Sequence, residues 1–281
     1  MIQEWEMKRM KIGNREFQTK GHTYVMGILN VTPDSFSDGG KWNDKDRALR
    51  HVEEMLNEGA DIIDIGGEST RPGYSLLSVE EETARVVPVI RALKEEFDVP
   101  VSLDTYKSGV AAAGIAAGAD MINDIWGLKW DDKIAGVIAG SGLPCCLMHN
   151  RKDTEYRDFV QDVIADLAET LQIADLAGIA RDRIIMDPGV GFAKTCEQNL
   201  EIIRRMEELQ GLGCPLLLGC SRKSVIGLTL NLPVEERLEG TLATTVIAVM
   251  KGCMFVRVHD VRENVRAVRM AEAILRRASV E

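Results

Sequence analysis

Eight short apolar runs recur along this chain of 281 residues, and longer segments with helical periodicity separate them. Runs that are apolar on both faces are typical of parallel strands, because helices cover both faces of a parallel sheet. Eight strands alternating with helices favour an α/β protein with a (β/α)8 TIM barrel, and an open doubly wound sheet is the alternative. The runs span residues 23–30, 60–66, 99–104, 120–124, 143–149, 183–189, 215–220 and 253–259.

The segments between the runs carry helical signals. Ala48, Val52 and Met55 fall at helical spacing in the first of them. Ser78 with Glu81, and Thr195 with Gln198, match the capping-box pattern that starts a helix. The last helix is predicted over 264–277.

The N-terminal segment predicts a β-hairpin. Residues 6–12 and 15–19 flank Gly13-Asn14, which suits a two-residue turn. Such a hairpin could plug the bottom of the barrel. No linker divides the chain, so we expect one domain over residues 1–281.

Composition excludes several classes of protein. The net charge of −10 argues against general nucleic-acid binding, although local cations can still bind small anions. No run approaches 18 apolar residues, so no membrane helix is expected. The first residues lack the apolar stretch of a signal peptide, and the six cysteines show no C-x-x-C spacing. We therefore expect a cytoplasmic protein with reduced thiols, most of them packed in the core.

Polar residues follow every predicted strand. Carboxyl ends of barrel strands meet at one face, where barrel enzymes place their active sites. The sequence therefore predicts a site at that face. The residues concerned are Asn30, Asp64, Asp104, Asn123, Asp124, His149, Asn150, Asp187, Ser221–Ser224, Arg257 and His259.

The acidic and amide side chains each have two interpretations. Asp104 and Asp187 could cap backbone N–H groups, or together accept hydrogen bonds from a flat heterocycle and stabilise positive charge. Asn30 could tie down a turn or provide an oxygen ligand for Mg²⁺. Asn123 could be structural or bind the edge of a heterocycle. His149 stays open between a structural and a catalytic role.

The last two strands predict an anion site. Arg257 and His259 alternate with apolar residues and can point into the barrel mouth, near Ser221 and Lys223 on the preceding loop. Arg222 is ambiguous and could point elsewhere. Two long polar loops, 31–40 and 66–74, are expected to form lids or substrate walls, and an exposed Phe36 could cover a ring.

Eight segments in order resemble the signatures of the dihydropteroate synthase family. The first two, GILNVTPDSFSDGG and DIGGESTRPG, are highly specific, and together the segments span most of the chain. They cover residues 27–40, 64–73, 102–111, 123–127, 147–151, 187–195, 219–227 and 257–261.

The resemblance implies a role for each matching residue. Asn30 would bind Mg²⁺ together with the substrate diphosphate, which Thr70, Arg257 and His259 would also hold. The pterin ring would be bound by Asp104, Asn123, Asp187, Lys223 and Arg257. Aminobenzoate would be bordered by Phe36, Asp38, Thr70, Arg71, Pro72, Phe192 and Ser224. The catalytic residues would be Asp104, Asp187, Lys223, Arg257 and His259.

The implied reaction joins 6-hydroxymethyl-7,8-dihydropterin diphosphate to 4-aminobenzoate, giving 7,8-dihydropteroate and diphosphate in folate biosynthesis. A monofunctional homodimer is implied, as is inhibition by sulfonamides, which mimic aminobenzoate. The rival readings are a methyltetrahydrofolate-binding methyltransferase domain, an aldolase that forms a Schiff base on Lys223, and a non-catalytic pterin-binding relative.

Overall fold

Strands and helices alternate along the chain as the apolar runs predict. The computed structural model describes residues 9–31, 41–68 and 76–275. Within them each of the eight predicted strands is present. The strands are β3 (Tyr24–Asn30), β4 (Ile62–Gly66), β5 (Val101–Asp104), β6 (Met121–Asp124), β7 (Cys145–Met148), β8 (Ile184–Asp187), β9 (Leu217–Leu218) and β10 (Phe255–Val258).

The strands close into a barrel. Their hydrogen-bonded order is β8-β7-β6-β5-β4-β3-β10-β9, and every pair is parallel. A parallel bridge between Met186 and Leu216 joins the two ends of this order, and Met186 N donates to the Pro215 carbonyl at 2.9 Å. Sequential order with closure confirms the (β/α)8 barrel, and the doubly wound alternative is wrong.

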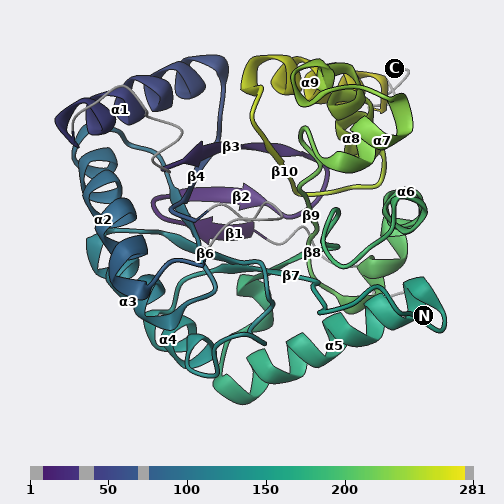
Figure 1. Cartoon of the computed structure of the whole chain (residues 1–281), viewed down its shortest axis with the longest axis horizontal. Helices are drawn as coiled ribbons and strands as arrows, with labels where there is room; N and C mark the ends of the chain where they lie inside the picture. The colour runs from purple at the N-terminus through teal and green to yellow at the C-terminus, as the bar shows by residue number, and fades with distance from the viewer. Residues whose placement is uncertain (1–8, 32–40, 69–75, 276–281) are drawn as a thin grey trace, which may run out of the picture.

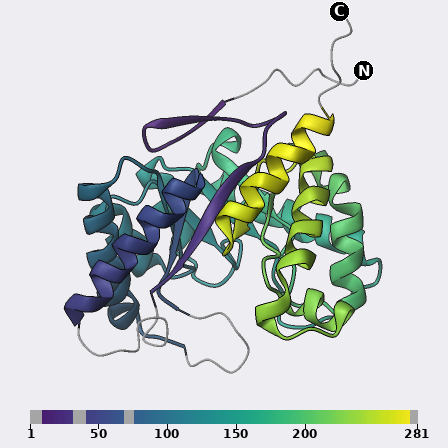
Figure 2. The ribbon, with the colours of Figure 1, turned by 90° about the horizontal axis from the view of Figure 1, so that it is seen from above.

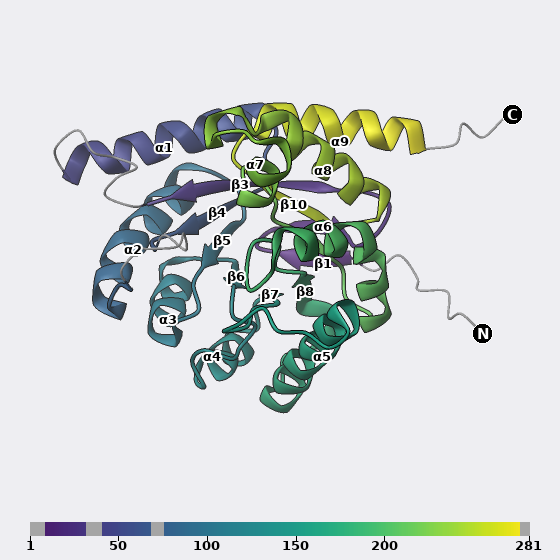
Figure 3. The same cartoon turned by 45° about the vertical axis from the view of Figure 1, so that its right-hand side comes forward.

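Helices surround the barrel as a ring (Figure 1). The capping boxes at Ser78 and Thr195 are both formed, which confirms the predicted helix starts. The last helix begins at Val261 instead of the predicted Asn264. It packs against both its predecessor and the first helix (Figure 3). The helices are α1 (Lys41–Glu58), α2 (Val79–Glu96), α3 (Ser108–Ala117), α4 (Ile134–Ser141), α5 (Phe159–Ala177), α6 (Cys196–Arg205), α7 (Ser224–Leu230), α8 (Leu238–Met250) and α9 (Val261–Leu275).

Each strand divides its side chains between two cores, because successive residues of a strand point to opposite faces. In β4, Ile63 and Ile65 pack in the outer core with the helices, whereas Ile62 packs inside the barrel. The same alternation turns Asp64 inward. In β10 it turns Arg257 inward as well, so charged groups enter the barrel through strand periodicity.

The N-terminal hairpin seals the lower end of the barrel. It consists of β1 (Arg9–Ile12) and β2 (Arg15–Gln18), which pair antiparallel. Its buried side chains are Met10, Ile12 and Phe17, and they cluster with inward residues of the strands. Figure 2 shows the hairpin across one end of the barrel, away from the carboxyl end of β3. The predicted plug is confirmed.

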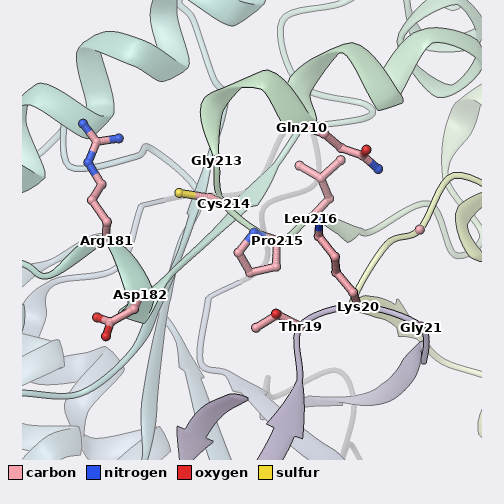
Figure 4. Close-up of a pocket in the computed structure, with 11 residues that line it drawn as sticks. Thr19, Lys20, Gly21, Arg181, Asp182, Gln210, Gly213, Cys214, Pro215 and Leu216 are labelled. Carbon is pink, nitrogen blue, oxygen red and sulfur yellow. The ribbon is translucent and has the colours of Figure 1, made fainter. Parts of the chain in front are cut away.

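A cavity of about 510 Å³ also lies at this lower end (Figure 4). It is lined by residues just after β2 and just before β8, β9 and β10, among them Lys20, Arg181 and Cys214. Barrel enzymes have their active sites at the opposite face, so this cavity is separate from the candidate site.

In the described ranges, no helix is both long and apolar enough to cross a membrane.

Candidate active site

Arg257 lies at the centre of the barrel mouth. Its Nε donates to Oδ2 of Asp64 at 2.5 Å, and its Nη2 donates to Oδ2 of Asp104 at 2.7 Å. Asn123 Nδ2 donates to the same Asp64 oxygen at 3.2 Å. Burial alone would lower the pKa of Arg257, but the two carboxylates outweigh burial and raise it above its ordinary value. The guanidinium therefore stays charged and orders strands β4, β5 and β10 around itself.

Asp104 has an unusual protonation equilibrium. Burial raises the pKa of its carboxyl group to about 7, although the charge of Arg257 opposes the shift. Asp104 lies opposite Asn123 in the register of β5 and β6. The family resemblance groups these two residues and Arg257 around one ring, and the structure brings the three side chains together.

Asp187 and Lys223 form the other side of the mouth. Asp187 Oδ1 accepts from Gly189 N at 2.7 Å, so the predicted capping role is present. A Cβ on Gly219 would lie 3.5 Å from the second oxygen of Asp187, Oδ2, and 4.0 Å from Arg257 Cβ, so the absence of a side chain at Gly219 leaves room between Asp187 and β10. Burial raises the pKa of Asp187, and Lys223 opposes that shift. Burial lowers the pKa of Lys223, while Asp187 opposes that change.

The interior of the mouth holds two buried oxygens that lack a partner. Asp64 Oδ1 and Ser102 Oγ have no hydrogen-bond partner in the described part of the chain. They sit on paired positions of β4 and β5. Buried polar atoms are usually satisfied, so an exception in an active-site position points to a ligand or water that supplies the donor.

The predicted anion site is partly assembled. His259 Nδ1 lies 3.0 Å from Ser221 Oγ, and His259 N donates to that hydroxyl oxygen at 3.1 Å. Arg222 turns away, because its Nε donates to Asp260 at 2.9 Å.

Asn30 and Asp104 flank Gly66 in adjacent strands. A Cβ on Gly66 would lie 3.8 Å from both Asn30 Oδ1 and Asp104 Oδ2.

Comparison with known proteins agrees with this geometry. The family model described as "Pterin binding enzyme" matches residues 26–259. A dihydropteroate synthase from Clostridium beijerinckii is 61% identical over 95% of this chain and 100% of its own length. The chain belongs to the dihydropteroate synthase family of pterin-binding enzymes.

Solved structures of dihydropteroate synthases show the same fold. The Clostridium difficile enzyme, solved in the presence of pteroic acid, aligns with a TM-score of 0.89 and 49% identity over 95% of this chain and 100% of that one. The Xanthomonas albilineans enzyme, solved with 4-aminobenzoic acid, aligns with a TM-score of 0.90 and 40% identity over 96% of this chain and 98% of that one. The match to these solved structures favours a dihydropteroate synthase over an aldolase or a methyltransferase.

An apolar cluster borders the polar centre of this dihydropteroate synthase fold. Tyr106, Ile125 and Met148 are buried together, with Trp126 and Phe192 packed against them. The Phe192 ring lies beneath Lys223, whose Nζ is 4.6 Å from the ring centroid. The same ammonium donates to the Val190 carbonyl. Phe192 therefore lies beside Lys223, and its role as an aminobenzoate neighbour stays a prediction.

Several predicted aminobenzoate residues cannot be placed. Phe36, Asp38, Thr70, Arg71 and Pro72 lie outside the described residues. Ser224 is described and is exposed at the first position of α7.

His149 belongs to a hydrogen-bonded network. Its Nε2 lies 2.9 Å from Asp166 Oδ2, and its Nδ1 lies 2.8 Å from Lys194 Nζ. Burial lowers the pKa of His149 to about 4, although the Asp166 hydrogen bond opposes the shift. The imidazole is therefore neutral near pH 7 and packs behind the mouth. This favours the structural interpretation of His149.

Asp64 is a site residue to which sequence reasoning gave no role. It is fully buried and contacts both Arg257 and Asn123. The signal was present in the alternation of β4, where an inward carboxylate follows the inward Ile62. Its partners, however, come from β6 and β10 and cannot be identified from that strand alone.

Proposed function

We propose that this chain is a dihydropteroate synthase that joins 6-hydroxymethyl-7,8-dihydropterin diphosphate to 4-aminobenzoate and releases diphosphate. The observation that carries the proposal is the bridge from Arg257 to Asp64 and Asp104, with Asn123 beside it. Asp187 and Lys223 complete the arrangement from the other side. Carboxylates and amides at this depth suit the N–H groups of a pterin, while a guanidinium suits an anion.

The unpartnered oxygens of Asp64 and Ser102 support a heterocycle bound deep in the mouth. Its ring N–H groups would give these acceptors or neighbouring waters a donor. Asp104 and Asp187 would then face the ring and stabilise positive charge that develops on it when the C–O bond weakens. A dissociative path follows from this placement, because the arylamine is a weak nucleophile.

Leaving-group departure would depend on hydrogen-bond donors placed at the diphosphate. Arg257 and His259 would bind the diphosphate and offset its growing charge. Phe192 and the apolar cluster would exclude water beside the reacting carbon, where water would otherwise capture the cation. The arylamine nitrogen would attack that carbon, the C–O bond would break, and the amine proton would leave to solvent.

We also propose a Mg²⁺ requirement, with Asn30 as the protein ligand. The fit rests on a hard oxygen donor at the end of β3 and on the room that Gly66 leaves beside it. No group of three or more His, Cys, Asp or Glu residues among those described could hold a metal alone. Mg²⁺ usually takes few protein ligands together with substrate phosphates and water, and bound Mg²⁺ would neutralise leaving-group charge.

The proposed enzyme is a homodimer that acts in the cytoplasm as one domain over residues 1–281. Exposed apolar side chains on α7, α8 and α9 support a partner surface; they include Leu228, Met250, Met270 and Ile274. The six cysteines are free thiols, which suits a reducing compartment. Sedimentation would test the dimer: a monomer at micromolar concentration would contradict it.

Diphosphate release tests the proposed reaction. The purified protein would be incubated with the pterin diphosphate and Mg²⁺, with and without 4-aminobenzoate. Release that needs both, together with 7,8-dihydropteroate formation, is expected, and chelation of Mg²⁺ should abolish it. Pterin binding without release would instead support a methyltransferase or a non-catalytic relative. Borohydride trapping with a carbonyl substrate would support an aldolase.

A further inference from the structure

The loop between β8 and α6 connects the two halves of the site. It begins after Asp187 and carries Phe192, whose ring lies under Lys223. Phe192 N donates to the Gly189 carbonyl at 3.1 Å, so residues 189–192 form a closed turn. The position of the Phe192 ring therefore depends on the shape of this turn.

Lys194 holds that turn from behind. Its ammonium donates to the Gly189 carbonyl at 3.0 Å and to the Phe192 carbonyl at 3.1 Å. It also contacts His149 Nδ1 at 2.8 Å. An ammonium has three N–H donors, and these three acceptors use all of them. Lys194 thus binds the first and last carbonyls of the turn at once.

The contact with His149 defines the histidine tautomer. Asp166 is an ionised carboxylate, because despite burial its bonds to His149 and Arg151 hold its pKa below the ordinary value, so it can only accept. The ring proton of neutral His149 therefore sits on Nε2, and Nδ1 accepts from Lys194. Nε2 faces Asp166 Oδ2 at 2.9 Å, and Arg151 Nε donates to that same carboxylate oxygen at 2.5 Å. The side chain of His149 is completely buried. The position of the Lys194 ammonium is therefore fixed by His149 and Arg151 on the loop after β7 and by Asp166 on α5.

The turn needs such support because its backbone is unusual. Gly189 has a φ of 71°, and a Cβ there would lie 1.9 Å from the His149 carbonyl oxygen. Ala193 has a φ of 46°, which side chains with a Cβ rarely adopt. The Ala193 carbonyl accepts from the Tyr156 hydroxyl at 2.8 Å. Residues held in this region persist where surrounding contacts fix them.

We propose that Lys194 is a positioning residue whose Nζ, in contact with His149 Nδ1, holds the Gly189–Phe192 turn and so places the Phe192 ring beside aminobenzoate. The inference rests on the proposed function for its substrate. Lys194 touches no substrate itself and acts only through the turn. Its removal should loosen the aminobenzoate border, while Asp104, Asn123 and Arg257, which lie on other strands, keep their places and retain most of the pterin affinity.

The first test compares Lys194→Met with the matched control Lys152→Met, a change at an exposed lysine on the preceding loop. Amide hydrogen exchange reports the turn, and the KM for aminobenzoate and the Kd for the pterin report the two subsites. We expect Lys194→Met to raise the KM about tenfold and to speed exchange at the Phe192 amide about tenfold, as for loss of about 1.4 kcal/mol. The pterin Kd should stay within about twofold, and Lys152→Met should match wild type.

Unchanged KM and exchange in Lys194→Met would overturn the proposal, and so would an equal weakening of both substrates. If Lys194→Met does not fold, two variants of His149 test the proposal in its place. His149→Asn keeps an acceptor near Lys194 and should retain the wild-type KM, whereas His149→Leu should reproduce the tenfold loss. Equal behaviour of the two would contradict the proposal.

Failure of the proposed function gives a different result. Wild-type protein would then show no aminobenzoate-dependent diphosphate release. The exchange comparison between Lys194→Met and Lys152→Met would still decide whether Lys194 holds the turn.

Discussion

Arg257 donates to Asp64 across the barrel mouth at 2.5 Å, although 193 residues separate the two in the chain. Asp64 also accepts from Asn123, so one buried carboxylate orients a cation and an amide that face the same space. Removing one partner of a buried charge pair leaves the other without compensation, and its cost exceeds that of losing an exposed pair.

Asp64→Asn should therefore impair the reaction, although sequence reasoning assigned no role to Asp64. We expect kcat/KM to fall by about 10- to 100-fold, from about 1.5–3 kcal/mol for a hydrogen bond to a charged group. Steady-state kinetics would measure it, with Asp182→Asn at the opposite end of the barrel as the control. Wild-type kinetics in Asp64→Asn would show that Arg257 needs only Asp104.

Asp104 should control the pH dependence of pterin binding. Burial raises the pKa of this carboxyl group to about 7, so its ionised form grows as the pH rises through 7. Affinity for 6-hydroxymethylpterin, which has no diphosphate to titrate, should rise from pH 6 to pH 8. Calorimetry would measure it, and Asp104→Asn should flatten the profile and slow turnover. A pH-independent affinity in wild type would contradict the role of the carboxylate.

His149 should make the fold sensitive to acid. Burial lowers its pKa from 6.5 to about 4, so His149 becomes protonated at a lower pH in the folded protein than in the unfolded chain. The stability from this group is complete above pH 6.5 and is lost as the pH falls toward 4. The free energy of unfolding should drop by about 3 kcal/mol more in wild type than in His149→Asn over this window. Urea titrations at both pH values would measure it; parallel losses would exclude His149 as the source.

The hairpin plug should stabilise the barrel from a distance. Phe17 is buried and lies 5.5 Å from Phe255, measured between ring centroids. Phe17→Ala should cost about 3–5 kcal/mol of unfolding free energy through lost burial and a cavity. Exposed Glu16→Ala in the same strand should change it by less than about 0.5 kcal/mol. Turnover at 25 °C should persist in folded Phe17→Ala. Loss of turnover with unchanged stability would contradict this prediction and show that the hairpin contributes to the active site.

The fold could be predicted from the sequence because the signals for its strands and helices are local. Strands buried on both faces need a continuous apolar run, and the capping boxes at Ser78 and Thr195 lie within four residues of chain. Boundaries were less readable. The run 215–220 forms a ladder only at Leu217–Leu218, because Leu216 bridges to the other neighbour, β8.

Only part of the candidate site could be predicted from the sequence. Asp104, Asn123, Asp187 and Arg257 follow apolar runs and could be assigned, since strand ends converge in a barrel. The roles of Asp64 and Lys194 depend on partners far away in sequence, and no local pattern identifies such partners. His149 stayed ambiguous for the same reason: its interpretation needs the contact with Lys194, 45 residues later.

The position of Arg257 in the last strand has a consequence for synthesis of the protein. Domains fold as they leave the ribosome, and at about 5–20 residues per second the chain needs roughly 10–40 s to extend from Asp64 to its cationic partner. Until then the growing chain carries Asp64 and Asp104 without the arginine that pairs with both in the finished barrel. β10 delivers that arginine in the same step in which it pairs with β3. Barrel closure and charge neutralisation therefore coincide, and a nascent chain that lacks its last strand has neither.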